Sequence, residues 1–372
     1  MTTDAQYLSK SAAKASLRPS DIALLRASLC DGDEAKDAFH IWRSLTDFEG
    51  DHDLGQYRML PLLHENMSKL QLDDPVMPRL RGVHRFSWCE ARRREFLVIK
   101  ALSKLQEKGI ELMALKGLAL SYDYYSDAAL RPMQDIDLLV RIDAVREAVD
   151  CLLALGWAHQ TPALHGSQAD LRILLGSEKS IQLTHKGGGE IDLHWYPFHE
   201  GVSQRVNDRF WRNAEKMSVA GVELMRPSPS DLLLHVIVHG LRANLVAPLR
   251  WAADAVMVIR RDQYAINWVE LEAFAARIQV SARLHLGLSL LREMLDMDIP
   301  LSAEPPTPSM VERFEIYAAG QISRYPGSYR AYWLEISITF VRLLLSENRR
   351  WLVPKISEWA IRRSKILLRS SR

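Results

Sequence analysis

The sequence predicts a mixed α/β (α+β) protein in which a small mixed sheet lies between two helical regions. Residues 1–108 carry apolar side chains mostly at helical spacing. Residues 109–226 alternate short strand-like runs with helical ones, which is typical of a sheet covered by helices. Helical spacing returns over 227–300, and residues 301–372 form a last helical part with a basic tail. These four ranges are the expected domain organisation.

The helices of the first region have recognisable ends. Ser20 and Asp21 are expected to cap a first helix, which Asp31-Gly32-Asp33 ends. A second helix is expected over 57–70, and a long one over 83–108 that stops at Gly109.

The middle region supplies the strands. Strands are expected over 110–115 and 135–140, and two more over 179–185 and 190–195 form a hairpin around three glycines. Two helices complete the region, over 118–125 and over 143–155, the second with Asp143 as N-cap and Gly156 as C-cap.

Four further helices are expected over 231–241, 249–261, 268–278 and 282–295. Residues 300–308 read as a linker. Residues 341–372 hold nine Lys/Arg and two Glu with interleaved apolar residues. This tail predicts either a solvated basic helix or contact with an anionic partner, such as a membrane surface, RNA or an acidic peptide.

Composition excludes several classes of protein. Of the 372 residues, 48% are hydrophobic and 25% charged, which is ordinary for a globular chain, and the net charge of +2 gives no argument for nucleic acid. Three distant cysteines favour a reducing compartment. The N-terminus lacks the apolar core of a signal peptide, and no stretch is long and apolar enough to span a membrane. We therefore expect a cytoplasmic protein without a transmembrane segment.

Clustered acids carry the chemical signal. Asp135 and Asp137 must share one face of a strand, because strand side chains alternate. Asp192 shares a face with Glu190 and His194 on the later strand. Carboxylates side by side repel unless a cation lies between them, and Mg²⁺ prefers oxygen ligands. If the two strands are neighbours, the three aspartates would hold divalent ions; the alternative is a solvated strand face.

Lys116 and Gly117 lie between a strand and a helix. Glycine allows backbone amides to approach a phosphate, the helix N-terminus favours an anion, and Lys116 would add a positive charge. Most Lys-Gly pairs are simple turns, and Lys116 has the alternative of lying along apolar surface.

Together these motifs resemble a known family. The run LKGLAL…RPMQDIDLLV, followed by EIDLHW, SPSDLLLHVIVHG and LRWAADAVMVI, resembles the putative nucleotidyltransferase family of the DNA polymerase β-like superfamily over about residues 83–300. The resemblance implies a mixed-sheet palm, Mg²⁺ binding and an NTP donor. It assigns the glycine motif to Gly117 and the three acids to Asp135, Asp137 and Asp192. Leu118 departs from the family, which has Gly or Ser there.

Other polar residues have weaker claims. His235 and His239 share a helix face at a spacing that zinc uses, but no third ligand is evident; packing, or for His239 a nucleotide contact, competes. Arg250 is expected either to pair with Asp254 or to reach the nucleotide, and Arg131 to contact a phosphate or a ligating carboxylate. His194 is a candidate general base.

We therefore expect a nucleotidyltransferase that binds two Mg²⁺ ions, with Mn²⁺ as a substitute. It would transfer a nucleoside monophosphate from an NTP, ATP first, to a hydroxyl of a small molecule or peptide. Catalysis and metal binding fall to Asp135, Asp137 and Asp192, and nucleotide binding to Lys116, Gly117, Arg131, His239 and Arg250. Two alternatives stay open: kinase-like phosphotransfer at the same site, and a nucleotide-binding module without turnover.

Overall fold

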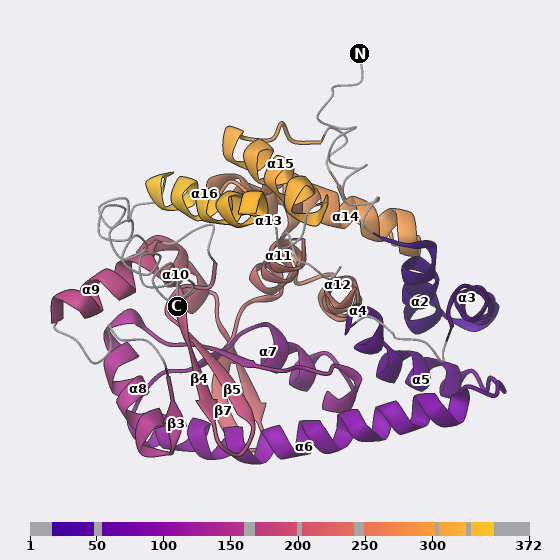
Figure 1. Cartoon of the computed structure of the whole chain (residues 1–372), viewed down its shortest axis with the longest axis horizontal. Coiled ribbons are helices and arrows are strands. Elements are labelled where there is room, and N and C mark those ends of the chain that lie inside the picture. Colours follow the sequence, from indigo (N-terminus) through magenta and orange to yellow (C-terminus); the bar gives the residue numbers. More distant parts are fainter. Residues whose placement is uncertain are drawn as a thin grey trace, which may run out of the picture.

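A computed structural model of the chain describes residues 17–47, 54–159, 168–198, 203–241, 249–301, 305–324 and 329–345. A twisted sheet lies above one long helix, α6, and beneath a layer of helices from the C-terminal half of the chain (Figure 1). Helices from the N-terminal part lie beside this assembly at one end of α6. Most of the basic tail, from residue 346 onward, falls outside the described residues.

The N-terminal part is helical, as predicted. Its helices are α2 (Pro19–Leu29), α3 (Gly32–Leu45), α4 (Leu54–Tyr57), α5 (Leu60–Lys69) and α6 (Met77–Glu107). The first cap differs from the prediction: α2 begins one residue before Ser20, with Arg18 as N-cap, and the Asp21 carboxylate accepts from the Arg18 amide at 2.9 Å. Helix α6 starts six residues earlier than expected, where Pro78 suits a first turn.

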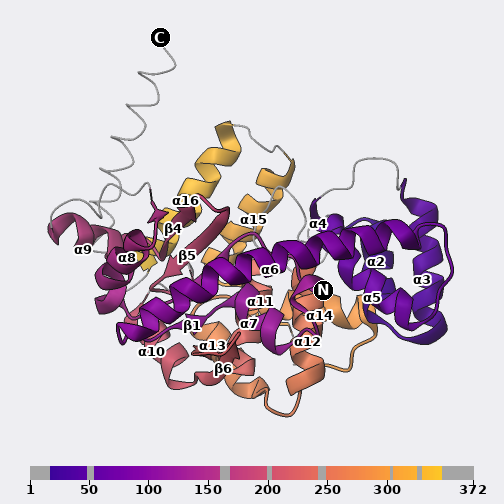
Figure 2. The ribbon, with the colours of Figure 1, turned by 90° about the horizontal axis from the view of Figure 1, so that it is seen from below.

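Helix α6 connects the two ends of the molecule. Seen from below, it crosses from the N-terminal helices α2, α3 and α5 to the outer part of the sheet near α8 (Figure 2). Arg93 on α6 donates to the carbonyl oxygens of Gly187 and Gly188 at 2.6 and 2.7 Å, and so holds the tight turn of a hairpin against the helix.

The sheet has seven described strands in the order β3-β4-β5-β2-β1-β7-β6. Their bounds are Met113–Ala114 (β1), Ile136–Leu139 (β2), Trp157–Ala158 (β3), Ser180–His185 (β4), Gly189–His194 (β5), Glu215–Val219 (β6) and Val222–Arg226 (β7). The predicted β4–β5 hairpin is confirmed, with Gly188 at φ +80 in its turn. Strands β2 and β5 are parallel neighbours. The β6–β7 hairpin was not predicted.

Short helices connect the strands: α7 (Lys116–Asp123), η1 (Ala128–Leu130), η2 (Ile142–Ala144), α8 (Val145–Ala154), α9 (Gln168–Ser177) and α10 (Gln204–Arg212). Helix α7 begins two residues before the predicted start. Asp143 lies in the 3₁₀ turn η2 and does not cap α8, whereas Gly156, at φ +88, follows the end of that helix as expected.

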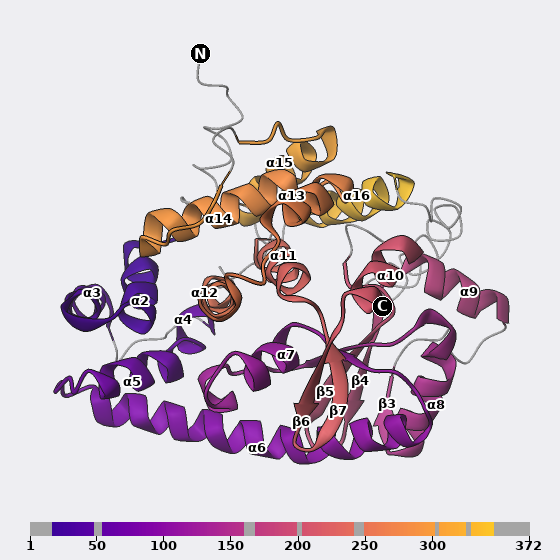
Figure 3. The same cartoon turned by 180° about the vertical axis from the view of Figure 1, so that it is seen from behind.

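In the C-terminal layer, the four helices with predicted bounds, α11–α14, match the prediction to within two residues at each end, and two more helices, α15 and α16, follow them. The layer consists of α11 (Pro229–Gly240), α12 (Arg250–Asp262), α13 (Trp268–Arg277), α14 (Ser281–Leu295), α15 (Met310–Arg324) and α16 (Tyr329–Leu345). Viewed from behind, α11 and α12 lie over α7, and α14 approaches α2 (Figure 3). Within the part of the chain that the structure describes, no helix is long and apolar enough to cross a membrane.

Two apolar cores flank the sheet. One is formed by the sheet, α8 and the C-terminal half of α6. The other joins the N-terminal helices to α11–α14 and includes Leu120 of α7 and Leu139 of β2. Helix α7 and the ends of β2 and β5 therefore lie where both cores meet.

Candidate active site

Two predicted acids face each other on neighbouring strands. Parallel pairing of β2 with β5 sets Asp137 directly beside Asp192, and Leu139 beside His194. In each strand the apolar residues on either side of the acid are buried in the sheet core, so the acids point to the other face. One ligand atom each from Asp137, Asp192 and His194 lie within 4.8 Å of one another.

His194 links the two acids. Its Nε2 lies 2.9 Å from Asp137 Oδ1 and 2.9 Å from Asp192 Oδ2, and the ring is fully buried. Its Nδ1 lies 3.3 Å from the carbonyl oxygen of Tyr196. Both a carbonyl and an ionised carboxylate only accept, so each of these contacts needs a proton on the His194 nitrogen that faces it. Through Nε2, His194 connects the two carboxylates.

Lys116 points into the acid cluster. Its Nζ donates to Asp137 Oδ1 at 2.7 Å, and the residue is 9% exposed. Its backbone has a φ of +35, a conformation that costs energy in a residue other than glycine. The alternative in which Lys116 lies along apolar surface is therefore excluded. A second lysine, Lys179, lies 3.8 Å from Asp192 Oδ2.

These cations change the electrostatics expected from the sequence. Burial raises the pKa of Asp137, but Lys116 and His194 outweigh it and hold the pKa well below its usual range. Burial also opposes ionisation of Asp192, yet His194 and Lys179 lower its pKa to about 2. Both acids are therefore charged at neutral pH, and their mutual repulsion is offset by side chains of the protein itself.

Asp135 has a different position. It precedes β2, is partly exposed, and lies outside the group of three ligand atoms formed by Asp137, Asp192 and His194. Its place on the same side as Asp137 follows from the alternation of strand residues. Its predicted role as a ligand stays a prediction.

Gly117 and Arg131 are in contact. A side-chain Cβ at Gly117 would lie 2.9 Å from Arg131 Nη1, so only glycine fits there without a shift. The Arg131 guanidinium is buried and binds Asp254 in a bidentate pair, Nε to Oδ1 and Nη2 to Oδ2, both 2.7 Å. Tyr125 donates its hydroxyl to the same carboxylate at 2.9 Å.

The ion pair of Arg250 with Asp254 is a wrong prediction. Asp254 pairs with Arg131 instead, and Arg250 donates through Nη1 to the carbonyl oxygen of Pro132. Helical spacing brings Arg250 and Asp254 to one face, but Arg131, which is 123 positions from Asp254, binds both oxygens of that carboxylate in a bidentate pair.

The two histidines of α11 have different environments. His235 is 1% exposed and packs its ring against Phe198, with the centroids 4.9 Å apart. Burial lowers its pKa well below the ordinary value, Lys116 adds to the effect, and its Nδ1 has no partner. His239 is exposed. Packing therefore accounts for His235, while the predicted nucleotide contact of His239 stays a prediction.

The donor set fits a divalent cation. Two ionised carboxylates and one imidazole converge within the distances that a single ion needs, and such a set suits Mg²⁺ or Mn²⁺ with the histidine extending the range toward other metals. Lys116 and His194 would have to release Asp137 and Asp192 to such an ion. Sequence reasoning missed Lys179, and it considered His194 only as a candidate general base.

A family comparison agrees with this geometry. The family model described as "Uncharacterised nucleotidyltransferase" matches residues 54–296, which includes every element that contributes to the site. The chain belongs to this nucleotidyltransferase family. A comparison with curated proteins finds no match. The fold, a mixed sheet flanked by helices, agrees with that of a nucleotidyltransferase, and membership implies a nucleotide substrate.

Proposed function

We propose that this nucleotidyltransferase transfers a nucleoside monophosphate from an NTP to a hydroxyl of an acceptor, using divalent cations held by its aspartates. The observation that carries the proposal is the pairing of Asp137 with Asp192 across two parallel strands, with His194 between their carboxylates. ATP is the first donor to test, and a small molecule or peptide the first acceptor class. A cytoplasmic location, expected from cysteine usage, belongs to the same proposal.

Asp137 and Asp192 would hold one cation, and Asp135 with Asp137 a second. Bound Mg²⁺, or Mn²⁺ in its place, would neutralise charge on the reacting phosphate and align the attacking and leaving oxygens. Asp192 is the more exposed of the two buried acids, with a side chain 22% exposed against 7% for Asp137. This exposure supports our proposal that Asp192 accepts a proton from an incoming hydroxyl.

Lys116 would then bind a phosphate oxygen. Its ammonium group donates to Asp137 and takes the place that a metal cation would have, so a metal ion that binds Asp137 would displace it. Lys116 is the first residue of α7 and precedes Gly117, so its displaced ammonium group would remain near the N-terminus of that helix. Helix N-termini favour anions, so a phosphate is the natural next partner. Arg131, Arg250 and His239 complete the proposed nucleotide-binding set.

The test is a product analysis with purified protein. Each NTP is incubated with Mg²⁺ and an extract of small molecules and peptides, and pyrophosphate and acceptor masses are followed. We expect pyrophosphate together with an acceptor that gains a nucleoside monophosphate. Release of NDP with an acceptor that gains one phosphate would instead establish the kinase-like alternative.

One observation favours a second candidate, a nucleotide-binding module without turnover. The contact between Lys116 and Asp137 satisfies an acid that an enzyme would need for a cation. If Mg²⁺ and NTP bind together but no acceptor, water included, yields either pyrophosphate or NDP, the chain is such a binding module.

A further inference from the structure

Guanidinium groups from three different elements converge on residues 131–134, the segment that leads into β2. Arg58, between α4 and α5, donates through Nη2 to Gln134 Oε1 at 2.5 Å. Arg250, the first residue of α12, donates to the carbonyl oxygen of Pro132. The third is Arg131 of the segment itself. Three arginines from separate parts of the chain thus lie near one segment: Arg58 comes from between α4 and α5, Arg250 from α12, and Arg131 from the residues before β2.

The positive charge here exceeds the negative charge. Two acids lie near the three arginines: Asp254 is the ion-pair partner of Arg131, and Asp135 attracts Arg58 from beyond ion-pair distance. Burial lowers the pKa of Arg250 to about 10, and the charge of Arg131 adds to that effect, as does that of Arg58, while the Asp254 carboxylate opposes it. Three guanidinium groups thus face two carboxylates. Like charges held together in this way are stabilised by an anion.

One of these groups also lacks a hydrogen-bond acceptor. Nη1 of Arg131 is buried and has no partner, although the other two guanidinium nitrogens are fully used by Asp254. It lies against Gly117, at the start of the eight-residue helix α7. A buried donor without an acceptor is costly, and it is rare in folded proteins unless a ligand supplies the acceptor.

We propose that Arg58, Arg131 and Arg250, with the first amides of α7, form a binding subsite for a phosphate group. The inference deepens the proposed function and rests on it for the identity of the phosphate carrier. Planar guanidinium forks match tetrahedral phosphate oxygens better than they match any neutral ligand. The carrier is either the terminal part of the NTP polyphosphate or a phosphorylated acceptor. Because Arg58 comes from outside the sheet region, the N-terminal helices contribute directly to substrate binding.

The test uses Arg58→Gln, since Arg58 is half-exposed and glutamine keeps a donor for Gln134. The matched control is Arg260→Gln, which removes an exposed arginine from α12. Calorimetric titrations are made with tripolyphosphate in EDTA, and with Mg–ATP, Mg–AMP and inorganic phosphate. We expect Arg58→Gln to weaken tripolyphosphate binding about ten-fold, on the scale of a charge-assisted hydrogen bond, and to reduce its salt dependence. Arg260→Gln should change neither.

The ligands separate the two carriers. Weaker tripolyphosphate and Mg–ATP binding with unchanged Mg–AMP binding assigns the subsite to the nucleotide polyphosphate. Weaker inorganic phosphate binding with unchanged Mg–ATP binding assigns it to a phosphorylated acceptor. If Arg58→Gln and Arg250→Lys both bind all four ligands as the wild type does, with unchanged thermal midpoints, the subsite does not exist.

The result is independent of the metal site. Tripolyphosphate in EDTA needs no aspartate, so Asp137→Asn should bind it as tightly as the wild type or more tightly. Loss of tripolyphosphate binding in Arg58→Gln without any turnover of NTP by the wild type would retain the subsite and refute the proposed function.

Discussion

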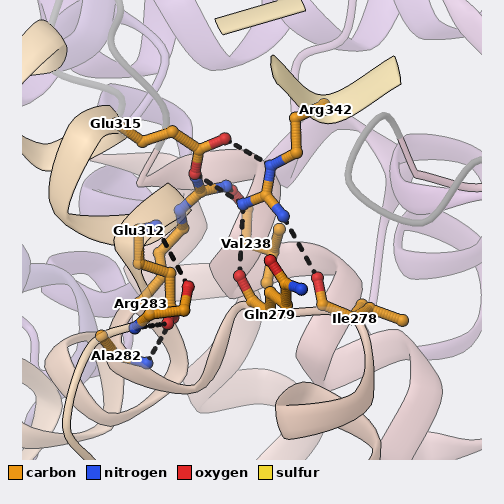
Figure 4. Close-up of polar contacts among 9 residues, drawn as sticks. Val238, Ile278, Gln279, Ala282, Arg283, Glu312, Glu315 and Arg342 are labelled. Carbon is orange, nitrogen blue, oxygen red and sulfur yellow. Dashed lines mark hydrogen bonds and ion pairs between the residues drawn. The ribbon is translucent and has the colours of Figure 1, made fainter. Parts of the chain in front are cut away.

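Two buried charge networks in this chain are built in opposite ways. On the C-terminal helices, Arg342 pairs with Glu315 through Nε and Nη2, at 2.5 and 2.6 Å, and donates to the carbonyl oxygens of Ile278 and Gln279, each at 3.2 Å (Figure 4). Glu315 also accepts from Arg283 at 2.7 Å. Each charged group in this network has partners from the protein.

The network at the ends of β2 and β5 is left incomplete. Asp137 Oδ1 is shared between Lys116 and His194, and the neighbouring Arg131 Nη1 and His235 Nδ1 have no partner. The Lys116 backbone adopts a strained conformation to keep its place. Several groups here would gain partners from a ligand, whereas the Arg342 network has little to gain.

The contrast separates two uses of buried charge. Arg342 binds the carbonyl oxygens of Ile278 and Gln279, which follow α13, and Glu312 accepts from the amide of Ala282 at the start of α14, at 2.7 Å. These contacts fix α15 and α16 on the helices below them. In the Asp137 cluster, by contrast, Arg131 Nη1 and His235 Nδ1 are left without partners, which agrees with the proposed binding of a cation and a polyphosphate.

The largest effect should come from breaking the complete network. Arg342→Met leaves Glu315 with fewer partners and two carbonyls uncapped, so unfolding free energy should fall by about 3–5 kcal/mol. Urea unfolding measures this, with Arg313→Met, an exposed arginine on α15, as the control. Mg–ATP affinity of the folded variant should stay at the wild-type value. A loss of affinity without a loss of stability would contradict the structural role.

Asp137→Asn should mainly weaken ligand binding, whereas Arg342→Met should mainly weaken the fold. The amide cannot hold a divalent cation, so Mg²⁺-dependent ATP binding should fall roughly a hundred-fold. Because Asp137 also balances Lys116 and His194, the apo protein should lose stability, contrary to expectations from acid repulsion alone. Thermal midpoints with and without Mg–ATP measure both effects, and Asp150→Asn, an exposed acid on α8, is the control. Equal ATP-induced shifts in EDTA and in Mg²⁺ would speak against the metal.

The stability of the metal-free protein should fall as the pH is lowered below about 4. The pKa of Asp192 is lowered to about 2 in the fold from an unfolded value near 3.8. Its contribution is therefore complete above about pH 4 and is lost as the pH falls toward 2, by about 2 kcal/mol. Urea unfolding in EDTA between pH 5 and pH 3 should show a steeper decline for the wild type than for Asp192→Asn. Parallel profiles would mean that the His194–Asp192 contact contributes nothing.

The smallest effect should distinguish the two tasks of Lys116. Lys116→Ala removes the cation that competes for Asp137, so Mn²⁺ alone should bind more tightly. The same change removes a phosphate contact, so nucleotide affinity should fall about ten-fold at low salt. Opposite signs for the two ligands are the expected signature. Weaker Mn²⁺ binding together with unchanged ATP binding would refute both tasks.

The spacing of apolar and polar residues in the sequence predicted much of the fold and part of the site. The alternating pattern of 135–140 and 190–195 predicted two strands with their acids on one face, and β2 and β5 pair as that pattern requires. Helix ends marked by Gly109 and Gly156 were also located, because a left-handed residue favours glycine there. Strands β6 and β7 were missed because both include charged residues and because their turn is Ala220-Gly221, both at positive φ, where Asn-Gly would be the usual signal.

Long-range pairing could not be obtained from local patterns. Nothing near Arg131 indicates that its partner is Asp254, and the helical i, i+4 rule pointed to Arg250 instead. The direction of the Lys116 side chain depends on its positive φ, and a lysine in the sequence gives no sign of such a backbone conformation. Arg58 was overlooked because its relation to residue 134 exists only after the N-terminal helices pack on the rest of the chain.

The most direct test of the account is the position of the cation. Crystals grown with Mn²⁺ and a non-hydrolysable ATP analogue would locate the metal through its anomalous scattering. We predict a peak that joins Asp137 and Asp192, with Lys116 withdrawn from Asp137 and turned to a phosphate oxygen. An ordered nucleotide with no metal at these carboxylates, and with Lys116 still bound to Asp137, would contradict the account.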